Sequence, residues 1–294
     1  MRIVSWNCGG ESYGGFNEKK YDEIMRYKPD ILLIQDITKK EYDDLTKDNP
    51  KFSELGEFAE DNSPPRTRHW YGDNAEENSK GIAIFSSLFY VELVENFNNK
   101  FLYVVPYIIN NFIFKALNST SNEKICVVIS VWANQPSDGS GDYQKAIFEA
   151  LDYYKFDLPI ILTGDFKTGS NEDNPHNYKK LKMNLEKHGL KNCAENTKYE
   201  YRPTFYHDKT DRYFTNDFCF ISEEYCIHNF HVDKMENQKP WHGLSDHCPI
   251  IADVYLSDLK PFGKHDFPYD ESKVTEEGKK ATQDLINWAK RSSS

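Results

Sequence analysis

The sequence lacks several features that would point to particular classes of protein. Its longest apolar stretches, such as 125–133 and 159–162, are far shorter than the roughly 20 residues that a membrane-spanning helix needs. No charged leader with a cleavable apolar segment stands ahead of the first candidate strand, so we expect no signal peptide. Internal repeats and extended low-complexity segments are also missing. We therefore expect a folded chain without a membrane span.

Cysteine pairing is the next missing feature. The six cysteines form no CxxC pair, and their spacing is not that of a disulfide framework. Free, buried thiols in a reducing compartment explain such scattered cysteines better than disulfides do. We therefore expect the protein to be cytoplasmic.

Positive charge is scarce. The 294 residues include 36 lysines and arginines against 47 acidic residues, which gives a net charge of −11. Such a charge repels a polyphosphate at long range and argues against a tight binder of duplex DNA. It is compatible with an enzyme in whose cleft a bound metal ion offsets the negative charge locally. The hydrophobic share of 38% is ordinary for a globular protein of one large or two small domains.

Short apolar runs alternate with helical patterns, which predicts a layered α/β architecture. The opening unit is a strand over 2–6, a helix over 17–27 with apolar residues at Tyr21, Ile24, Met25 and Tyr27, and a strand over 31–35. Further strands are predicted at 81–86, 102–109, 112–117, 125–133, 160–163, 213–221, 226–232 and 249–255, and helices at 143–154 and 178–188.

The pattern changes after residue 256. Pro261, Gly263 and Pro268 are followed by a mildly amphipathic stretch over 271–291. We therefore predict a main domain over 1–256 and a C-terminal extension over 257–294 that contains a helix. The extension either packs on the domain or binds a partner.

Acids, amides and one histidine lie at the ends of several predicted strands or inside them. A single acid after a strand is more often a turn or helix-cap residue than a ligand. A set of such residues in apolar strand contexts is harder to explain in that way, and it predicts a site assembled from many segments. The members of the set are Asn7, Asp36, Asp165, Asp217, Asp246 and His247.

The motifs that contain these residues resemble, in order and spacing, the endonuclease/exonuclease/phosphatase superfamily. The resemblance covers residues 1 to about 255, and the closing Ser-Asp-His-x-Pro motif is its most specific part. It implies a four-layered α/β sandwich of two packed mixed sheets flanked by helices, with the active site at the common edge of the sheets. The motifs are Ser-Trp-Asn at 5–7, Pro-Asp-Ile-Leu-Leu-Ile-Gln-Asp at 29–36, Gly-Ile-Ala-Ile-Phe-Ser at 81–86, Gly-Asp-Phe at 164–166, Asp-Phe-Cys-Phe at 217–220 and Ser-Asp-His-Cys-Pro-Ile at 245–250.

The resemblance also implies a role for each residue. Carboxylates suit Mg²⁺ or Mn²⁺, which are hard ions that prefer oxygen ligands. Asp36 would be the principal metal ligand, and Asn7 and Asp246 would complete the metal network. Asp165 would orient or deprotonate the attacking water. His247 would bind the scissile phosphate, with its ring held by Asp217, because a carboxylate partner fixes the tautomer and favours the imidazolium.

Three positions depart from the pattern of the superfamily. Asp36 stands where Glu is usual and is one methylene shorter. Lys167 replaces the neutral amide of the usual Gly-Asp-Phe-Asn motif; its cation could contact phosphate, pair with Asp165, compete with the metal or point to solvent. Where many relatives place a Tyr or His on the phosphate, the chain has Val-Trp-Ala-Asn at 131–134, in which Asn134 is the candidate donor.

The sequence supports three hypotheses of function. The leading one is a Mg²⁺- or Mn²⁺-dependent nuclease, endonucleolytic or exonucleolytic, acting on DNA or RNA as a monomer. The acidic net charge favours the second, a phosphatase or phosphodiesterase for a small molecule or a lipid head group. The third is a non-hydrolytic relative that serves as a binding module, which Lys167 and the missing Tyr or His favour.

Overall fold

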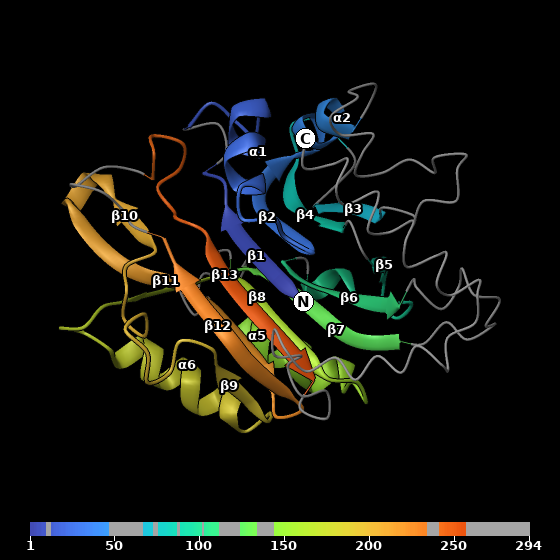
Figure 1. The fold of residues 1–294 in the computed structure, drawn as a ribbon, viewed down its shortest axis with the longest axis vertical. Helices are drawn as coiled ribbons and strands as arrows, with labels where there is room; N and C mark the ends of the chain where they lie inside the picture. The colour runs from blue at the N-terminus through green and yellow to red at the C-terminus, as the bar shows by residue number, and fades with distance from the viewer. Residues whose placement is uncertain are drawn as a thin grey trace, which may run out of the picture. The chain divides into compact units, whose positions relative to one another are not determined.

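The computed structural model describes residues 1–9, 13–46, 67–72, 76–86, 89–101, 103–111, 124–133, 144–233 and 241–256. These residues form two β-sheets and four α-helices (Figure 1). The four helices of the described part are α1 (Glu18–Met25), α2 (Lys39–Thr46), α5 (Lys145–Tyr154) and α6 (His176–Glu186). Two short 3₁₀ helices, η2 (Asn99–Phe101) and η3 (Asp208–Thr210), lie in connections.

The first sheet is mixed. Its only parallel pair in the described part of the chain is β1–β2, which α1 connects. The other neighbours run antiparallel. The strands lie in the order β12 (Tyr225–Val232), β13 (Ile250–Leu256), β1 (Arg2–Asn7), β2 (Ile31–Thr38), β4 (Lys80–Ser86) and β3 (Thr67–Gly72).

The second sheet is mixed as well, with β7 and β8 parallel. The remaining neighbours are antiparallel, and the short β9 (Leu190–Asn192) pairs with β11 beside the main path. The main path is β10 (Phe205–His207), β11 (Arg212–Ser222), β8 (Ile160–Ser170), β7 (Lys124–Trp132), β6 (Val104–Asn111) and β5 (Phe89–Leu93).

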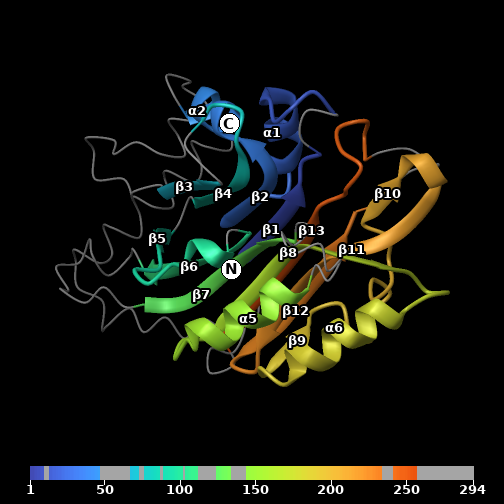
Figure 2. The ribbon, with the colours of Figure 1, turned by 180° about the vertical axis from the view of Figure 1, so that it is seen from behind.

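The side chains of β7 show how the layers pack. Successive side chains of a strand point to opposite faces of its sheet. Cys126 and Val128 belong to the core that the two sheets share, together with residues of β1 and β2. Val127 and Ile129 belong to a second core, in which α5 and α6 cover the outer face of the sheet. Figure 2 shows these two helices in front of the strands. Burial on both faces explains why β7 is continuously apolar from Ile125 to Ile129.

A polar side chain links the two sheets inside their shared core. Gln35 of β2 is fully buried, and its Nε2 donates hydrogen bonds to Ser5 Oγ of β1 at 3.0 Å and to Ser130 Oγ of β7 at 3.3 Å. Buried amides normally have such partners, because an unpaired one is costly. Gln35 directly precedes Asp36, so the link fixes the end of β2 where the candidate site begins.

The prediction of an α/β fold with two mixed sheets and flanking helices is confirmed. The sequence interpretation missed α2, β3, β5, β9 and β10. The expected strand over 112–117 and the whole extension over 257–294 lie outside the described residues, so the division at residue 256 stays a prediction. All six cysteines are free thiols, and five are buried. No helix in the described part of the chain is long and apolar enough to cross a membrane.

Candidate active site

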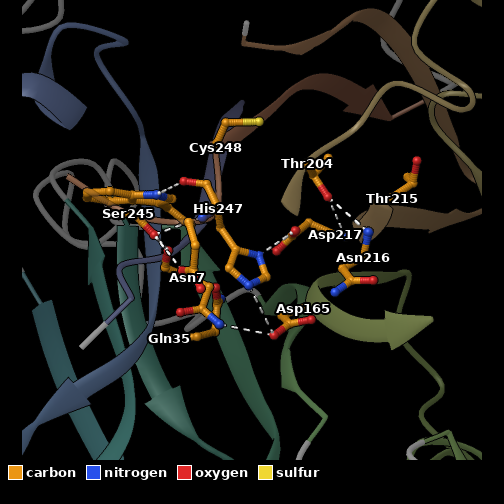
Figure 3. Close-up of polar contacts among 12 residues, drawn as sticks. Asn7, Gln35, Asp165, Thr204, Thr215, Asn216, Asp217, Ser245, His247 and Cys248 are labelled. Atoms are coloured by element: carbon orange, nitrogen blue, oxygen red, sulfur yellow. Dashed lines mark hydrogen bonds and ion pairs between the residues drawn. The ribbon is translucent and has the colours of Figure 1, made fainter. Parts of the chain in front are cut away.

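Strand pairing brings the predicted catalytic residues together. In the pairing of β8 with β11, Asp165 lies directly opposite Asp217. Asn7 ends β1 of the other sheet, and its Nδ2 donates to Asp165 Oδ2 at 3.0 Å. His247 follows the loop before β13 and lies between the two acids (Figure 3). Four residues that are widely separated in the sequence thus meet at a common edge of the two sheets.

His247 is held by its ring and by its backbone. Its Nδ1 lies 2.8 Å from Asp217 Oδ2, and its Nε2 lies 3.9 Å from Asp165 Oδ2. The ring of Phe205 lies against the imidazole, with centroids 4.7 Å apart. Trp6 Nε1 donates to the carbonyl oxygen of His247 at 3.0 Å. These contacts fix the orientation of the imidazole and leave Nε2 facing Asp165.

Thr204 fixes the acid that orients the histidine. The strand β11 has an irregularity between Thr215 and Asp217, where the pairing with β8 shifts. The hydroxyl of Thr204 accepts hydrogen bonds from the amides of Asn216 and Asp217, both at 3.0 Å. A bulge leaves ladder hydrogen bonds unmade and re-aims a side chain. Thr204 replaces those hydrogen bonds and sets the position of the Asp217 carboxylate.

The electrostatics of the site give His247 and Asp165 opposite roles, one as a cation and the other as a base. Burial opposes the charged imidazolium, but the carboxylates of Asp217 and Asp165 outweigh it and raise the pKa of His247 to about 9. The imidazole is therefore charged at neutral pH. Asp165 is fully buried, and this burial raises the pKa of its carboxyl group, while the charge of His247 acts in the opposite direction. A carboxylate with a raised pKa is a better general base for a water molecule.

Asp36 lies on a bulge of β2. It has a left-handed backbone with φ of +60°, and the register with β4 shifts between Gln35 and Ile37. Its Oδ1 forms an ion pair with Lys80 Nζ at 2.8 Å. Burial raises the pKa of Asp36, whereas the ammonium groups of Lys80 and Lys167 lower it. The predicted principal metal ligand therefore already has a cationic partner.

The donor set suits a hard divalent ion. Ligand atoms of Asp165, Asp217 and His247 all lie within 4.8 Å of one another, and no other such group occurs among the described residues. His247 could join a metal site only as a neutral imidazole, so the carboxylates and the amide beside it are the better ligands while His247 is charged. Asn7 adds an amide that contacts Asp165. The side chain of Asp246 adds another carboxylate, whose charge raises the pKa of Asp36. Carboxylate and amide oxygens are the ligands that Mg²⁺ and Mn²⁺ prefer.

Lys167 is tied to the site through its backbone. Its amide donates to Asp165 Oδ1 at 2.9 Å, and its φ is +45°. Its ammonium lies 5.9 Å from the centroid of the Trp132 ring. Asn134, the other predicted phosphate contact, lies outside the described residues. Trp132 instead lies opposite Asp165 in the pairing of β7 with β8.

Sequence interpretation assigned no role to three residues at this edge, Lys80, Thr204 and Trp132. Lys80 directly precedes a predicted strand, and nothing in its neighbours indicates a pairing with Asp36. Thr204 belongs to a Pro-Thr-Phe stretch, which is a usable signal because Phe205 also contacts His247. The indole Nε1 of Trp132 is buried without a hydrogen-bond partner in the described structure. The sequence offered a signal for Trp132, because it lies in the 131–134 stretch where many relatives place a Tyr or His on the phosphate.

Comparisons with known proteins give structural matches. No family model matches the sequence, and no curated protein matches it. A 3′ phosphatase from Neisseria, solved with a product DNA hairpin, is 15% identical, with a TM-score of 0.56 over 86% of this chain and 98% of that chain. An AP endonuclease from Archaeoglobus fulgidus is 14% identical, with the same TM-score and the same two coverages.

A third similar structure is an endonuclease/exonuclease/phosphatase from Beutenbergia cavernae, 16% identical, with a TM-score of 0.55 over 87% of this chain and 71% of that chain. Identities this low establish the fold and not the activity. The sequence motifs and these whole-domain matches agree. The chain has the fold of the endonuclease/exonuclease/phosphatase superfamily.

Proposed function

We propose that the protein is a divalent-metal-dependent phosphodiester hydrolase that acts on nucleic acid, with Mg²⁺ or Mn²⁺ as its cofactor. The buried group of Asp165, His247 and Asp217 is the observation that supports this proposal most strongly. Burying two carboxylates and an imidazole at a sheet edge is costly, and such perturbed groups cluster at functional sites.

The geometry suggests how these residues act. Charged His247 donates to a non-bridging phosphate oxygen and stabilises the negative charge that develops there. Asp217 holds the imidazole in the required tautomer through its contact with Nδ1. Asp165 orients the attacking water and accepts its proton. A bound divalent ion, held by Asn7, Asp36 and Asp246, would supply positive charge and lower the pKa of a coordinated water.

Two of the similar structures support a nucleic-acid substrate, since one was solved with a DNA hairpin and the other is an AP endonuclease. One observation favours the alternative of a small phosphorylated molecule or a lipid head group. The net charge of −11 gives a nucleic acid little long-range attraction. Lys80 and Lys167 near Asp36 favour a non-hydrolytic binding module, because both cations compete with a metal ion.

A metal-titrated assay on a panel of substrates separates these functions. The panel contains single-stranded DNA, duplex DNA, RNA and a generic bis-aryl phosphodiester, each with increasing Mg²⁺ or Mn²⁺ and with excess chelator. Metal-dependent cleavage of a nucleic acid supports the proposal. Hydrolysis of the bis-aryl ester alone indicates a small-molecule substrate. If no substrate turns over at any metal concentration, or if chelator leaves turnover intact, the proposal is wrong.

A further inference from the structure

The carboxylate of Asp36 forms an ion pair with Lys80 of the same chain. Lys80 Nζ lies 2.8 Å from Asp36 Oδ1, which is the distance of a close ion pair. The side chain of Asp36 is 15% exposed and that of Lys80 is 42% exposed. The acid is therefore nearly enclosed, whereas the lysine side chain is partly in contact with solvent.

The backbone of both strands builds this contact. Asp36 is the extra residue of a bulge, since Gln35 pairs with Ile82 and the next paired residue, Ile37, faces Gly81. Thr38 then lies opposite Lys80. A bulge bends its strand and redirects the side chain of the extra residue. The left-handed φ of Asp36 costs energy, which is typical of residues held in place for function.

Other charges surround this pair. Lys167 lowers the pKa of Asp36, and Asp246 raises it, so both lie within electrostatic range. Lys20 is fully buried, and its Nζ donates to the carbonyl oxygen of Cys8 at 2.7 Å. Burial lowers the pKa of Lys20, whereas the charges of Asp36 and Asp246 raise it. The negative charges of Asp36 and Asp246, which are predicted to hold a divalent ion, are thus offset by the positive charges of nearby lysines.

We propose that Lys80 is a resident cation of the metal site: it neutralises Asp36 in the metal-free protein, and a divalent ion must displace it in order to bind. This inference rests on the proposed function, because it requires Asp36 to be a metal ligand. An ammonium and a divalent ion repel each other strongly when they share one carboxylate. Lys80 therefore sets the metal affinity and lowers it relative to a site with a free acid.

Direct Mn²⁺ binding tests this proposal without any measurement of turnover. Free Mn²⁺ is followed by electron paramagnetic resonance in titrations of the wild type, Lys80→Gln and Lys80→Arg. Gln removes the charge and keeps a polar side chain, so the dissociation constant of Lys80→Gln should fall on the order of tenfold. Arg keeps the charge, so Lys80→Arg should bind Mn²⁺ like the wild type. An unchanged or weaker affinity of Lys80→Gln overturns the proposal.

Two further variants separate the effect of the Lys80–Asp36 contact on Mn²⁺ affinity from the effect of removing any positive charge. Lys100 forms an exposed ion pair with Glu149 at 3.0 Å, and Lys100→Gln should leave Mn²⁺ affinity unchanged. Lys167→Gln removes a charge that also acts on Asp36. If Lys167→Gln tightens binding as much as Lys80→Gln does, the effect is general electrostatics and the displacement proposal is wrong.

The failure of this inference differs from the failure of the proposed function. When the wild type binds Mn²⁺ and hydrolyses a substrate but Lys80→Gln has the same affinity, only the role of Lys80 is wrong. If neither the wild type nor Lys80→Gln binds Mn²⁺, both proposals fail.

Discussion

Lys167 combines a strained backbone with a charge at the site. A left-handed conformation costs an ordinary L-residue roughly 1–2 kcal/mol, and Asn tolerates it better than Lys does. The conformation is maintained because the amide of Lys167 donates to Asp165 Oδ1 at 2.9 Å. The residue that most distinguishes this chain from the superfamily pattern thus keeps the backbone geometry that the usual Asn would adopt easily.

Lys167→Asn should therefore stabilise the fold. We expect the free energy of unfolding to rise by about 0.5–1 kcal/mol, because Asn relieves the strain at positive φ. Lys167→Ala is the matched control, since Ala gains no such relief. Urea unfolding of both variants measures the difference. An Asn variant that is no more stable than the Ala variant would show that the strain is not relieved in this way.

His247 and Asp217 should behave as one unit in catalysis. We expect His247→Ala and Asp217→Asn each to lower kcat/KM by a factor on the order of 10² or more, because one group stabilises charge and the other orients it. The 2.8 Å contact implies that the double variant loses less than the product of the two single losses. Steady-state kinetics of the three variants measure this coupling. Losses that multiply would contradict the proposed unit.

At the scale of elements, the stretch that contains Thr204 joins β11 to the loop before β13. The amide of Cys248 donates to the carbonyl oxygen of Thr204 at 2.9 Å, and the Thr204 hydroxyl accepts from two amides of β11. Phe205 pairs with His247 through an isolated bridge. The short segment of Thr204 and Phe205 therefore positions both Asp217 and His247.

Thr204→Ala should destabilise the protein through these amides. Thr204 is fully buried, and the loss of its hydroxyl leaves two buried N–H groups without an acceptor, at about 1–3 kcal/mol each. Thr204→Ser keeps the hydroxyl and removes only a methyl group. Urea unfolding of the two variants should separate them by at least about 1 kcal/mol. Equal stabilities would mean that other groups satisfy the two amides.

The sequence predicted the elements that depend on local composition. The apolar runs over 125–133 and 31–35 correspond to β7 and β2, since buried strands are largely apolar. The predicted strand over 213–221 corresponds to β11. The helix α2 was missed although Thr38 and Glu41 form a capping box at its start, in which each side chain accepts a hydrogen bond from the other residue's amide. The bulges beside Asp36 and Asp217 depend on the register between strands, which one sequence does not encode locally.

At the scale of the whole molecule, long-range packing assembles the proposed phosphate site in a negatively charged chain. Asn7 and Asp165 are 158 positions apart, yet their side chains are in contact, because the end of β1 lies against the middle of β8. The net charge is −11, but His247 is charged and Lys80 and Lys167 lie near Asp36. These positive groups offset the carboxylates of Asp36, Asp165, Asp217 and Asp246 at the site, although the chain as a whole is acidic.

The central claim is that this edge of the two sheets is a metal-dependent hydrolytic site in which Asp165 acts on the attacking water. Asp165→Asn tests it most directly, because the amide keeps the size of the side chain and an oxygen that can accept from Lys167. Turnover of the bis-aryl phosphodiester is measured for the wild type and the variant across a Mn²⁺ titration, with thermal unfolding as the check on folding. We predict metal-dependent turnover in the wild type and a loss on the order of 10² or more in the folded variant at every Mn²⁺ concentration. Equal turnover in the two proteins would contradict the account.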